Sequence, residues 1–305
     1  MARLQWRSAV VVVLLISMIS IEIQAFSVQP ISTVIHTIDD ISCREIQVYI
    51  SNIDTSITLL EATIEGQEML VDEVLLLDDE VDIESDNKVV NDDPYGSVLW
   101  PAALTVSEHI TSDSFFKKKR EDNDEQQKPS LLELGTGTGL VALAASVSNK
   151  YSTIHATDYE TIPLKLLDAA QKLNSNQNHC KISTSLFDIC DLSISLPQAD
   201  IICAADILYE KKTGIALAKR TIEALERGSR VVIGCSPGRP GRPAFIEELQ
   251  RLLEKDVNFV DVEGTTCTGE RNSLICGEGS TSISKEPQAL QVALLDLTPE
   301  CLESQ

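Results

Sequence analysis

Short apolar runs alternate with amphipathic stretches from residue 131 to residue 297, and this alternation constrains the fold more than any other feature of the chain. The apolar runs have the length of buried strands, and the stretches between them have helical periodicity. The predicted strands are residues 131–134, 152–157, 181–186, 201–205, 230–234, 258–262 and 291–297. Such alternation is typical of a mostly parallel sheet with helices on both faces. The sequence therefore predicts an α/β fold with seven strands.

Helical faces support this reading. Two sets of apolar residues recur at helical spacing: Ile162, Leu166, Ala170 and Leu173, and then Ile215, Ala218, Ile222 and Leu225. Pro163 suits a first helical turn, and Gly228 suits a C-terminal cap. Further helices are expected from residue 100 to about residue 110 and through residues 245–253. The Gly- and Ser-containing segment between the last two strands is expected to be a loop.

The N-terminal part of the chain carries targeting signals. Arg3 and Arg7 precede an uncharged stretch over residues 9–21, which matches the apolar core of a signal peptide and is short for a membrane span. The pair Ala25-Phe26 resembles the junction in plastid-targeting presequences of algae with complex plastids. We expect a signal peptide-like segment at residues 1–25 and a transit segment or linker at residues 26–45. The expected destination is the plastid through the secretory route; an uncleaved anchor, secretion and a cytoplasmic location are the alternatives.

Residues 46–100 are predicted to form an N-terminal extension to a larger catalytic domain at residues 101–300. β-Branched residues from 44 to about 60 predict a strand or hairpin. The acidic stretch 72–93 interrupts the apolar run 74–77 and predicts a solvated loop, with a docking surface for a basic partner as the alternative. The basic quartet 117–120 is flanked by acids and predicts a solvated loop rather than a nuclear signal.

Charge and cysteine spacing exclude some classes of function. The formal net charge of −22 disfavours direct binding of nucleic acid. Eight cysteines form no CxxC pair and four histidines are scattered, so no structural metal is expected. Cys203 and Cys235 lie in apolar runs and are predicted to be buried and inert.

A glycine-rich motif follows the first predicted strand of the alternating region. Residues 132–140 read Leu-Glu-Leu-Gly-Thr-Gly-Thr-Gly-Leu, in which the glycines allow a tight turn and close approach to a nucleoside. A dinucleotide fingerprint needs a glycine at position 140, which is Leu here. The spacing is the GxGxG of enzymes that use S-adenosylmethionine (SAM). Glu133, Gly135, Thr136 and Gly137 are the candidate cofactor residues of this loop.

Acidic residues end the following predicted strands. Asp158 ends the second strand, where its carboxylate can accept both ribose hydroxyls of SAM. Asp188 follows the third strand and is expected at the adenine edge, with capping or solvation as the alternative. Asp206 follows the fourth strand, in the crevice where ligands bind, and is expected to face the transferable methyl group. The alternative is that Asp206 caps the following helix and Tyr209 packs in the core.

Four segments together resemble one family, the small seven-strand protein-lysine methyltransferases, which also include histidine and calmodulin methyltransferases. These segments are Gly96-Ser97-Val98-Leu99-Trp100-Pro101-Ala102-Ala103, residues 133–140, Thr157-Asp158-Tyr159-Glu160 and Ala205-Asp206-Ile207-Leu208-Tyr209. The resemblance implies a Rossmann-like class I SAM methyltransferase fold with a short N-terminal β extension. It also implies cofactor contacts from Trp100, Gly135, Gly137, Asp158 and Ala205, and a methyl-acceptor channel shaped by Asp206 and Tyr209. The chain departs from many relatives by carrying Phe187-Asp188 where they have tryptophan.

The leading hypothesis is a SAM-dependent methyltransferase that acts on a lysine of a protein, with a basic target suited to the acidic surface. Methylation of a histidine, an arginine or a small metabolite is the alternative within enzymes. A non-catalytic SAM-binding scaffold with a chaperone-like role is the alternative of another class. No membrane association is expected after processing, and no sequence feature indicates an oligomeric state.

Overall fold

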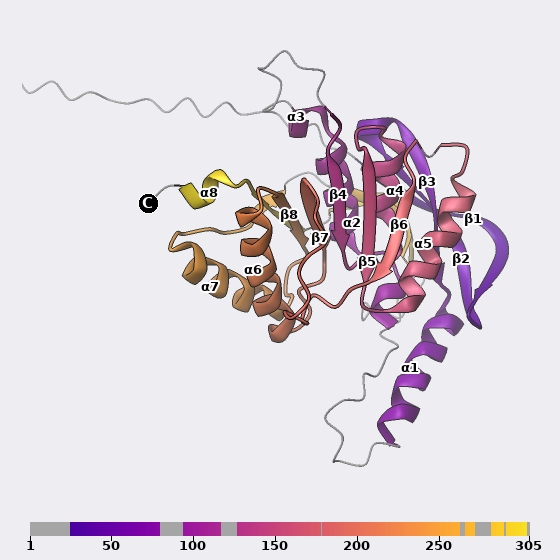
Figure 1. The fold of residues 1–305 in the computed structure, drawn as a ribbon. Helices are drawn as coiled ribbons and strands as arrows, with labels where there is room; N and C mark the ends of the chain where they lie inside the picture. The colour runs from indigo at the N-terminus through magenta and orange to yellow at the C-terminus, as the bar shows by residue number, and fades with distance from the viewer. Residues whose placement is uncertain are drawn as a thin grey trace, which may run out of the picture.

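The computed structural model describes residues 25–79, 94–116, 127–177, 179–262, 266–271, 282–289 and 291–303, and every structural statement refers to these residues. They form two sheets with helices packed on them (Figure 1). The larger sheet has seven strands in the order β6-β5-β4-β7-β8-β12-β9. The smaller sheet has five strands in the order β11-β10-β1-β2-β3.

The seven-stranded sheet confirms the predicted α/β fold. Its strands are β4 (Ser130–Leu134), β5 (Thr153–Asp158), β6 (Ile182–Leu186), β7 (Ile201–Ala205), β8 (Arg230–Cys235), β9 (Val260–Val262) and β12 (Val292–Leu297). Strands β4 to β8 are all parallel, whereas β12 runs antiparallel to β8 and β9. Each strand lies at its predicted position to within about two residues. The strong periodicity of this region is the reason for the agreement.

Alternate side chains of these strands enter two different cores. Leu131, Ile201 and Cys203 point into the core beneath α2 (Pro101–Thr111) and α4 (Leu140–Val147). Their neighbours Leu132 and Ile202 point to the opposite face. That face is covered by the helices α6 (Lys211–Glu226) and α7 (Gly241–Leu253). The two-residue period of a strand therefore feeds both layers, as a doubly covered sheet requires.

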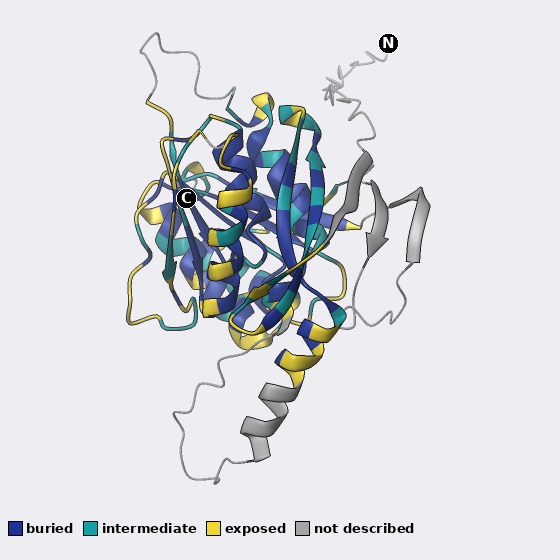
Figure 2. Cartoon of the chain, turned by 90° about the vertical axis from the view of Figure 1, so that its right-hand side faces the viewer, coloured by how far each residue is buried: buried dark blue, intermediate teal, exposed yellow. Residues whose placement is uncertain are grey.

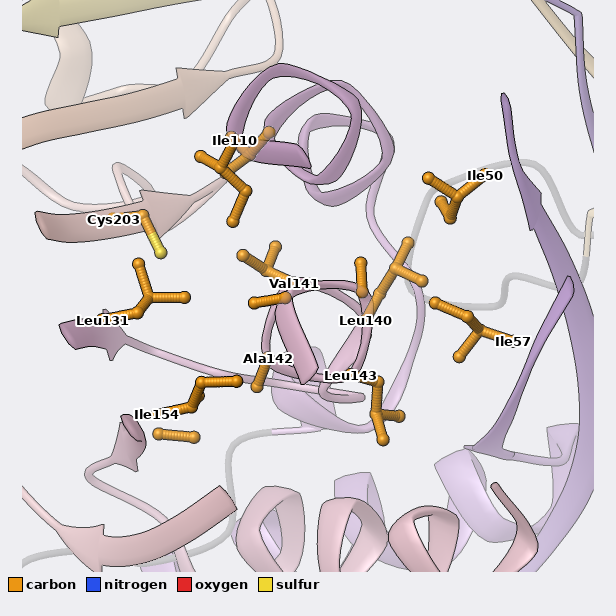
Figure 3. Close-up of a cluster of buried hydrophobic side chains, with 14 of the residues drawn as sticks. Ile50, Ile57, Ile110, Leu131, Leu140, Val141, Ala142, Leu143, Ile154 and Cys203 are labelled. Atoms are coloured by element: carbon orange, nitrogen blue, oxygen red, sulfur yellow. The ribbon is translucent and has the colours of Figure 1, made fainter. Parts of the chain in front are cut away.

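Helix α4 begins directly after the glycine-rich loop and lies at the centre of the molecule. All eight of its residues are buried, and none is charged. Figure 3 shows the reason: Val141 faces Leu131 and Ile110, whereas Leu140 and Leu143 face Ile57 and its neighbours of the smaller sheet. A helix that is apolar all round must be buried on every side. Helix α4 is therefore enclosed between the two sheets.

The smaller sheet contains more of the chain than the sequence indicated. Its strands are β1 (Ala25–Ile38), β2 (Ile41–Ile50), β3 (Thr55–Ala62), β10 (Thr266–Arg271) and β11 (Ser282–Ala289). The predicted N-terminal hairpin is β2–β3, but residues 26–45, expected as a transit segment or linker, hold β1 and the start of β2. The expectation of a loop between the last two strands was wrong, because β10 and β11 lie there and β10 pairs with β1. Partners this far apart in sequence leave no local signal.

Polar contacts attach the β2–β3 hairpin to the larger domain. The Glu108 carboxylate on α2 accepts hydrogen bonds from the backbone amides of Ser51 and Asn52, at 2.5 and 3.0 Å, within the short 3-10 turn η1 (Ser51–Ile53). The Asn174 side chain accepts from the Thr58 amide and donates to the Thr58 carbonyl, at 3.0 and 2.7 Å. Asn174 follows α5 (Thr161–Leu173) and completes the edge of β3 as another strand would. The extension thus shares the core of the larger domain.

Helix α1 (Ile64–Asp79) replaces the first part of the predicted acidic loop. It projects from the body, and its exposed residues include Met69 and Val71 (Figures 1 and 2). The expectation of a loop from residue 72 was therefore wrong as far as Asp79. The rest of the acidic stretch, the basic quartet 117–120 and the targeting residues 1–24 lie outside the described residues.

The remaining elements are short: η2 (Pro94–Ser97), α3 (Asp113–Phe116) and α8 (Glu300–Glu303). Gly228 lies just after α6 with a φ of 83°, as expected of a C-terminal cap. Cys203 and Cys235 are fully buried, as predicted. No helix of the described part has the length and apolar character needed to cross a membrane.

An ion-pair cluster on β12 makes the stability of the fold pH-dependent. Asp296 contacts His109 at 2.7 Å and Arg230 at 2.6 Å. Burial opposes ionisation, but hydrogen bonds from His109 and Arg230 outweigh it and lower the pKa of Asp296 from 3.8 to about 2. A lowered carboxyl pKa stabilises the fold above the unfolded-state pKa, and the effect disappears as the pH falls from about 4 to about 2.

We therefore expect Asp296→Asn to lower the free energy of unfolding by about 2 kcal/mol at pH 6, and by about half as much at pH 3. Urea unfolding of both proteins across this pH range measures the difference. The control is Asp256→Asn, because Asp256 is exposed and bonded to the amides of Gln250 and Asn258. A loss of stability for Asp296→Asn that stays constant between pH 6 and pH 3 would contradict the prediction.

Candidate active site

A cavity of about 400 Å³ lies at the carboxyl ends of β4, β5, β6 and β7. The strand order changes direction between β4 and β7. Strands β5 and β6 lie on one side of β4, whereas β7 and β8 lie on its other side. Open α/β sheets bind their ligands at this kind of switch point. The volume is within the range of small-molecule sites in proteins.

All ten residues that the sequence predicted for the site line this one cavity. They are Trp100, Glu133, Gly135, Thr136, Gly137, Asp158, Asp188, Ala205, Asp206 and Tyr209. They come from five segments spread over more than a hundred positions of the chain. The structure brings them together because the carboxyl ends of parallel strands meet at one edge of a sheet.

The glycine-rich loop between β4 and α4 forms the floor of the cavity. Gly135 and Gly137 have φ angles of 69° and 51°, in the left-handed region where side chains are disfavoured. A Cβ atom at Gly135 would lie 2.5 Å from the Ile207 side chain. Glycine at position 135 is therefore required both by the backbone conformation and by the approach of Ile207.

Glu133 and Thr136 support this loop from beneath. The Glu133 carboxylate accepts a hydrogen bond from the Thr136 hydroxyl at 2.8 Å and another from the Ala142 amide at 3.1 Å. Burial raises the pKa of Glu133 to about 8, although the bonds from Thr136 and Ala142 lower it. Both polar side chains bond to each other below the loop. These bonds set the shape of the loop, and the expected role of Glu133 and Thr136 as cofactor residues stays a prediction.

Asp158 lies at the end of β5, beside the glycine-rich loop. Its carboxylate accepts hydrogen bonds from the Gly137 amide at 3.1 Å and the Glu160 amide at 3.2 Å. An ionised carboxylate has about four acceptor sites and can accept several hydrogen bonds at once. Asp158 is thus fixed against the loop with its carboxylate on the cavity wall, where hydroxyl groups of a ligand could donate to it.

The segment after β6 forms another wall. The Asp188 carboxylate accepts a hydrogen bond from the Cys190 amide at 2.7 Å and so caps a local turn, as the capping alternative expected. Phe187 also lines the cavity, and the Arg220 guanidinium lies 5.1 Å from its ring centre. The buried Arg220 also donates to the Ile189 carbonyl at 3.2 Å. Arg220 therefore holds this wall in place from α6.

Four hydrogen bonds hold the Asp206 carboxylate. Its carboxylate accepts from the Ala102 amide at 3.1 Å, from the Ser236 amide and hydroxyl at 2.7 Å each, and from the Arg239 Nε atom at 3.1 Å. The Asp206 side chain is only 1% exposed. Asp206 also lines the cavity, and its expected position beside the transferable methyl group stays a prediction. Asp206 holds the start of α2, not the helix that follows it.

Tyr209 is half-buried and lines the cavity, and its ring packs against the core on the α6–α7 face. Aromatic residues make up 4% of the chain, yet five of them line this cavity. They are Tyr95, Trp100, Tyr159, Phe187 and Tyr209. The walls are therefore flat and partly apolar, which suits a nucleoside and an uncharged amine.

Sequence reasoning missed Arg239, Tyr95 and Tyr159. Arg239 follows β8 in Ser-Pro-Gly-Arg-Pro, and a cation at the carboxyl end of a central parallel strand is a signal that could have identified it. Tyr95 adjoins the recognised segment that begins at Gly96, and Tyr159 lies within the recognised segment at residues 157–160, but neither was assigned to the site. In the described ranges, no group of three or more His, Cys, Asp or Glu side chains is arranged to hold a metal ion.

A seven-stranded sheet of this topology, with a GxGxG loop and an acidic residue ending the next strand, defines a SAM-dependent methyltransferase. The chain belongs to the lysine methyltransferase family, because the family model described as "Lysine methyltransferase" matches residues 77–252, more than half of its length. The sheet topology, the glycine-rich loop and the family are therefore those of enzymes that transfer a methyl group from SAM.

Curated relatives agree with this family. The human electron transfer flavoprotein beta subunit lysine methyltransferase is 27% identical over 175 residues, which are 57% of this chain and 60% of the human protein. The rat protein of the same name is 27% identical over 50% of this chain and 53% of its own length. The match thus spans less than two thirds of these relatives. Among solved structures, TrmN from Thermus thermophilus is 24% identical, covers 41% of this chain and 37% of its own, and has a TM-score of 0.32.

The cavity fits the cofactor in shape and chemistry. Gly135 and Gly137 line the cavity without side chains, so that their backbone can approach a flat nucleoside closely. Asp158 would accept the ribose hydroxyls, and Phe187 with Asp188 would border the adenine. Trp100 and Ala205 complete the remaining wall.

Proposed function

We propose that this enzyme transfers the methyl group of SAM to the side-chain amine of a lysine in a protein substrate. The observation that carries the proposal is the position of Tyr209 and Trp100, which line the same cavity as the glycine-rich loop. The family description and the names of the curated relatives support lysine as the acceptor.

The residues of the cavity would act mainly by positioning. When bound, SAM supplies a methyl group attached to a positively charged sulfur. A lysine amine has a pKa of roughly 10.4 in water and must be neutral to attack. The aromatic walls around Tyr209 and Trp100 disfavour the ammonium form and hold the amine in line. Asp206 contributes indirectly, because its charge is already matched by Arg239.

A basic protein substrate fits the charge of the chain. The formal net charge of −22 attracts basic surfaces over a Debye length of about 8 Å at physiological salt. We therefore propose that the target lysine lies in a basic segment or a basic protein. The curated relatives are named for one protein substrate, the electron transfer flavoprotein beta subunit.

Transfer of labelled methyl groups tests the proposed acceptor. The purified enzyme is incubated with methyl-tritiated SAM and a lysate of the source cell, and the labelled residue is mapped by mass spectrometry. A folded Asp158→Ala protein is the matched negative control. Label on a protein lysine supports the proposal. Label on histidine, arginine or a small metabolite overturns the choice of acceptor, and SAM binding without transfer favours a scaffold.

For the N-terminal segment, we propose routing through the secretory pathway to a plastid, on the basis of residues 1–26 of the sequence. A fluorescent protein fused after residue 45 is expected in that compartment, and Phe26→Ala is expected to divert it. Fluorescence microscopy of both fusions measures this. Diffuse cytosolic signal from the unchanged segment would contradict the proposed route.

A further inference from the structure

Arg239 lies between the Asp206 carboxylate and the Trp100 ring. It belongs to the turn between β8 and α7, and its side chain is 15% exposed. The Arg239 Nε atom donates to the Asp206 Oδ1 atom at 3.1 Å. On its other side, the guanidinium carbon lies 4.1 Å from the centre of the Trp100 ring. One planar group thus joins a buried charge to an aromatic face.

Trp100 is fixed at a second point. Its indole Nε1 donates to the Tyr95 carbonyl at 2.8 Å, and the Tyr95 ring lies 6.1 Å away at an interplanar angle of 38°. Trp100 also directly precedes α2, whose Ala102 amide is bonded to Asp206. Trp100, Arg239 and Asp206 all line the SAM cavity. The three residues therefore form one connected part of its wall.

We propose that Arg239 is a positioning residue, which uses the charge of Asp206 to orient its guanidinium and so holds the Trp100 ring in the cofactor cavity. An arginine is suited to this because its planar fork can bond a carboxylate and stack on a ring at once. A partly desolvated cation–π contact is stronger than an exposed one. The role goes beyond the proposed function and is the same whichever acceptor the enzyme uses.

The chain offers a matched control three residues further on. Arg242 also stacks on an aromatic ring, with its guanidinium carbon 4.6 Å from the centre of the Phe259 ring. Arg242 does not line the cavity that holds Trp100 and Asp206. Arg242→Ala removes a similar cation–π contact at the start of α7 and leaves the cavity wall unchanged.

Trp100 can report on its own position. The sequence contains two tryptophans, Trp6 and Trp100, so in a Trp6→Phe protein the intrinsic fluorescence comes from Trp100 alone. In that background we expect Arg239→Ala to shift the emission to longer wavelength and to increase quenching by acrylamide. Calorimetry should show the Kd for S-adenosylhomocysteine rising about three- to thirtyfold, the range for one cation–π contact. Arg242→Ala should change neither measurement.

A conservative variant separates positioning from folding. Arg239→Lys keeps the charge that faces Asp206 but loses the planar stack, so we expect partial rescue of both the emission and the Kd. If Arg239→Ala does not fold, Arg239→Lys is compared directly with the parent. A folded variant with lower thermal stability but unchanged Trp100 emission and ligand affinity would overturn the proposal, and so would equal changes in Arg242→Ala.

Discussion

Asp158→Ala is expected to weaken SAM binding by about 10- to 150-fold. This corresponds to about 1.5–3 kcal/mol, the range for hydrogen bonds to a charged group. The carboxylate borders the cavity and bonds the Gly137 amide at 3.1 Å, so we expect its loss to remove hydrogen bonds to the ribose and to loosen the glycine-rich loop. Isothermal titration calorimetry with SAM measures the change.

The control for this prediction is Asp168→Ala. Asp168 is an exposed carboxylate of α5 that bonds the Gln171 side chain at 3.2 Å, and it does not line the cavity. SAM affinity should be unchanged in this control. Unchanged affinity in a folded Asp158→Ala protein would instead mean that Asp158 serves the loop alone and does not receive the ribose.

The strands and the cavity could be predicted because their signals are local. A buried parallel strand is a short apolar run, and the residue that ends it lies at the binding edge of the sheet. Asp158 and Asp206 were placed at that edge by this rule. The same rule would have indicated Arg239, had the turn after β8 been treated in the same way as the ends of β5 and β7.

The partners of each side chain could not be predicted, because they come from distant parts of the chain. The Asp206 carboxylate bonds the Ala102 amide, 104 positions away, and Arg239, 33 positions away. Likewise, β1 pairs with β10 across most of the sequence. A pattern can show that a carboxylate reaches the site, but only the packed fold shows whether its charge is already satisfied.

Asp206→Asn is expected to lower the stability and the turnover of the enzyme together. Each carboxylate oxygen of Asp206 receives two hydrogen bonds, so the amide of an asparagine would face donors in either orientation. Removing one partner of a buried ion pair costs about 3–5 kcal/mol, and the Arg239 guanidinium would lose its partner here. The φ of 60° at Asp206 adds no strain, since asparagine tolerates the left-handed region.

This outcome separates two roles for the motif. If the Asp206 carboxylate contacts the amine directly, Asp206→Asn should lower the turnover of the enzyme about ten- to a thousandfold and leave its stability normal. If the carboxylate instead holds Arg239 and the start of α2, Asp206→Asn should lower the free energy of unfolding and the turnover, and shift the Trp100 emission, all together. Urea unfolding, fluorescence and methyl transfer are measured on Asp206→Asn. The control is Glu210→Gln, because Glu210 has an exposed carboxylate and lines the same cavity. The free energy of unfolding of this control should not change. If Asp206→Asn keeps its full stability but loses turnover, Asp206 contacts the acceptor directly and the positioning role is wrong.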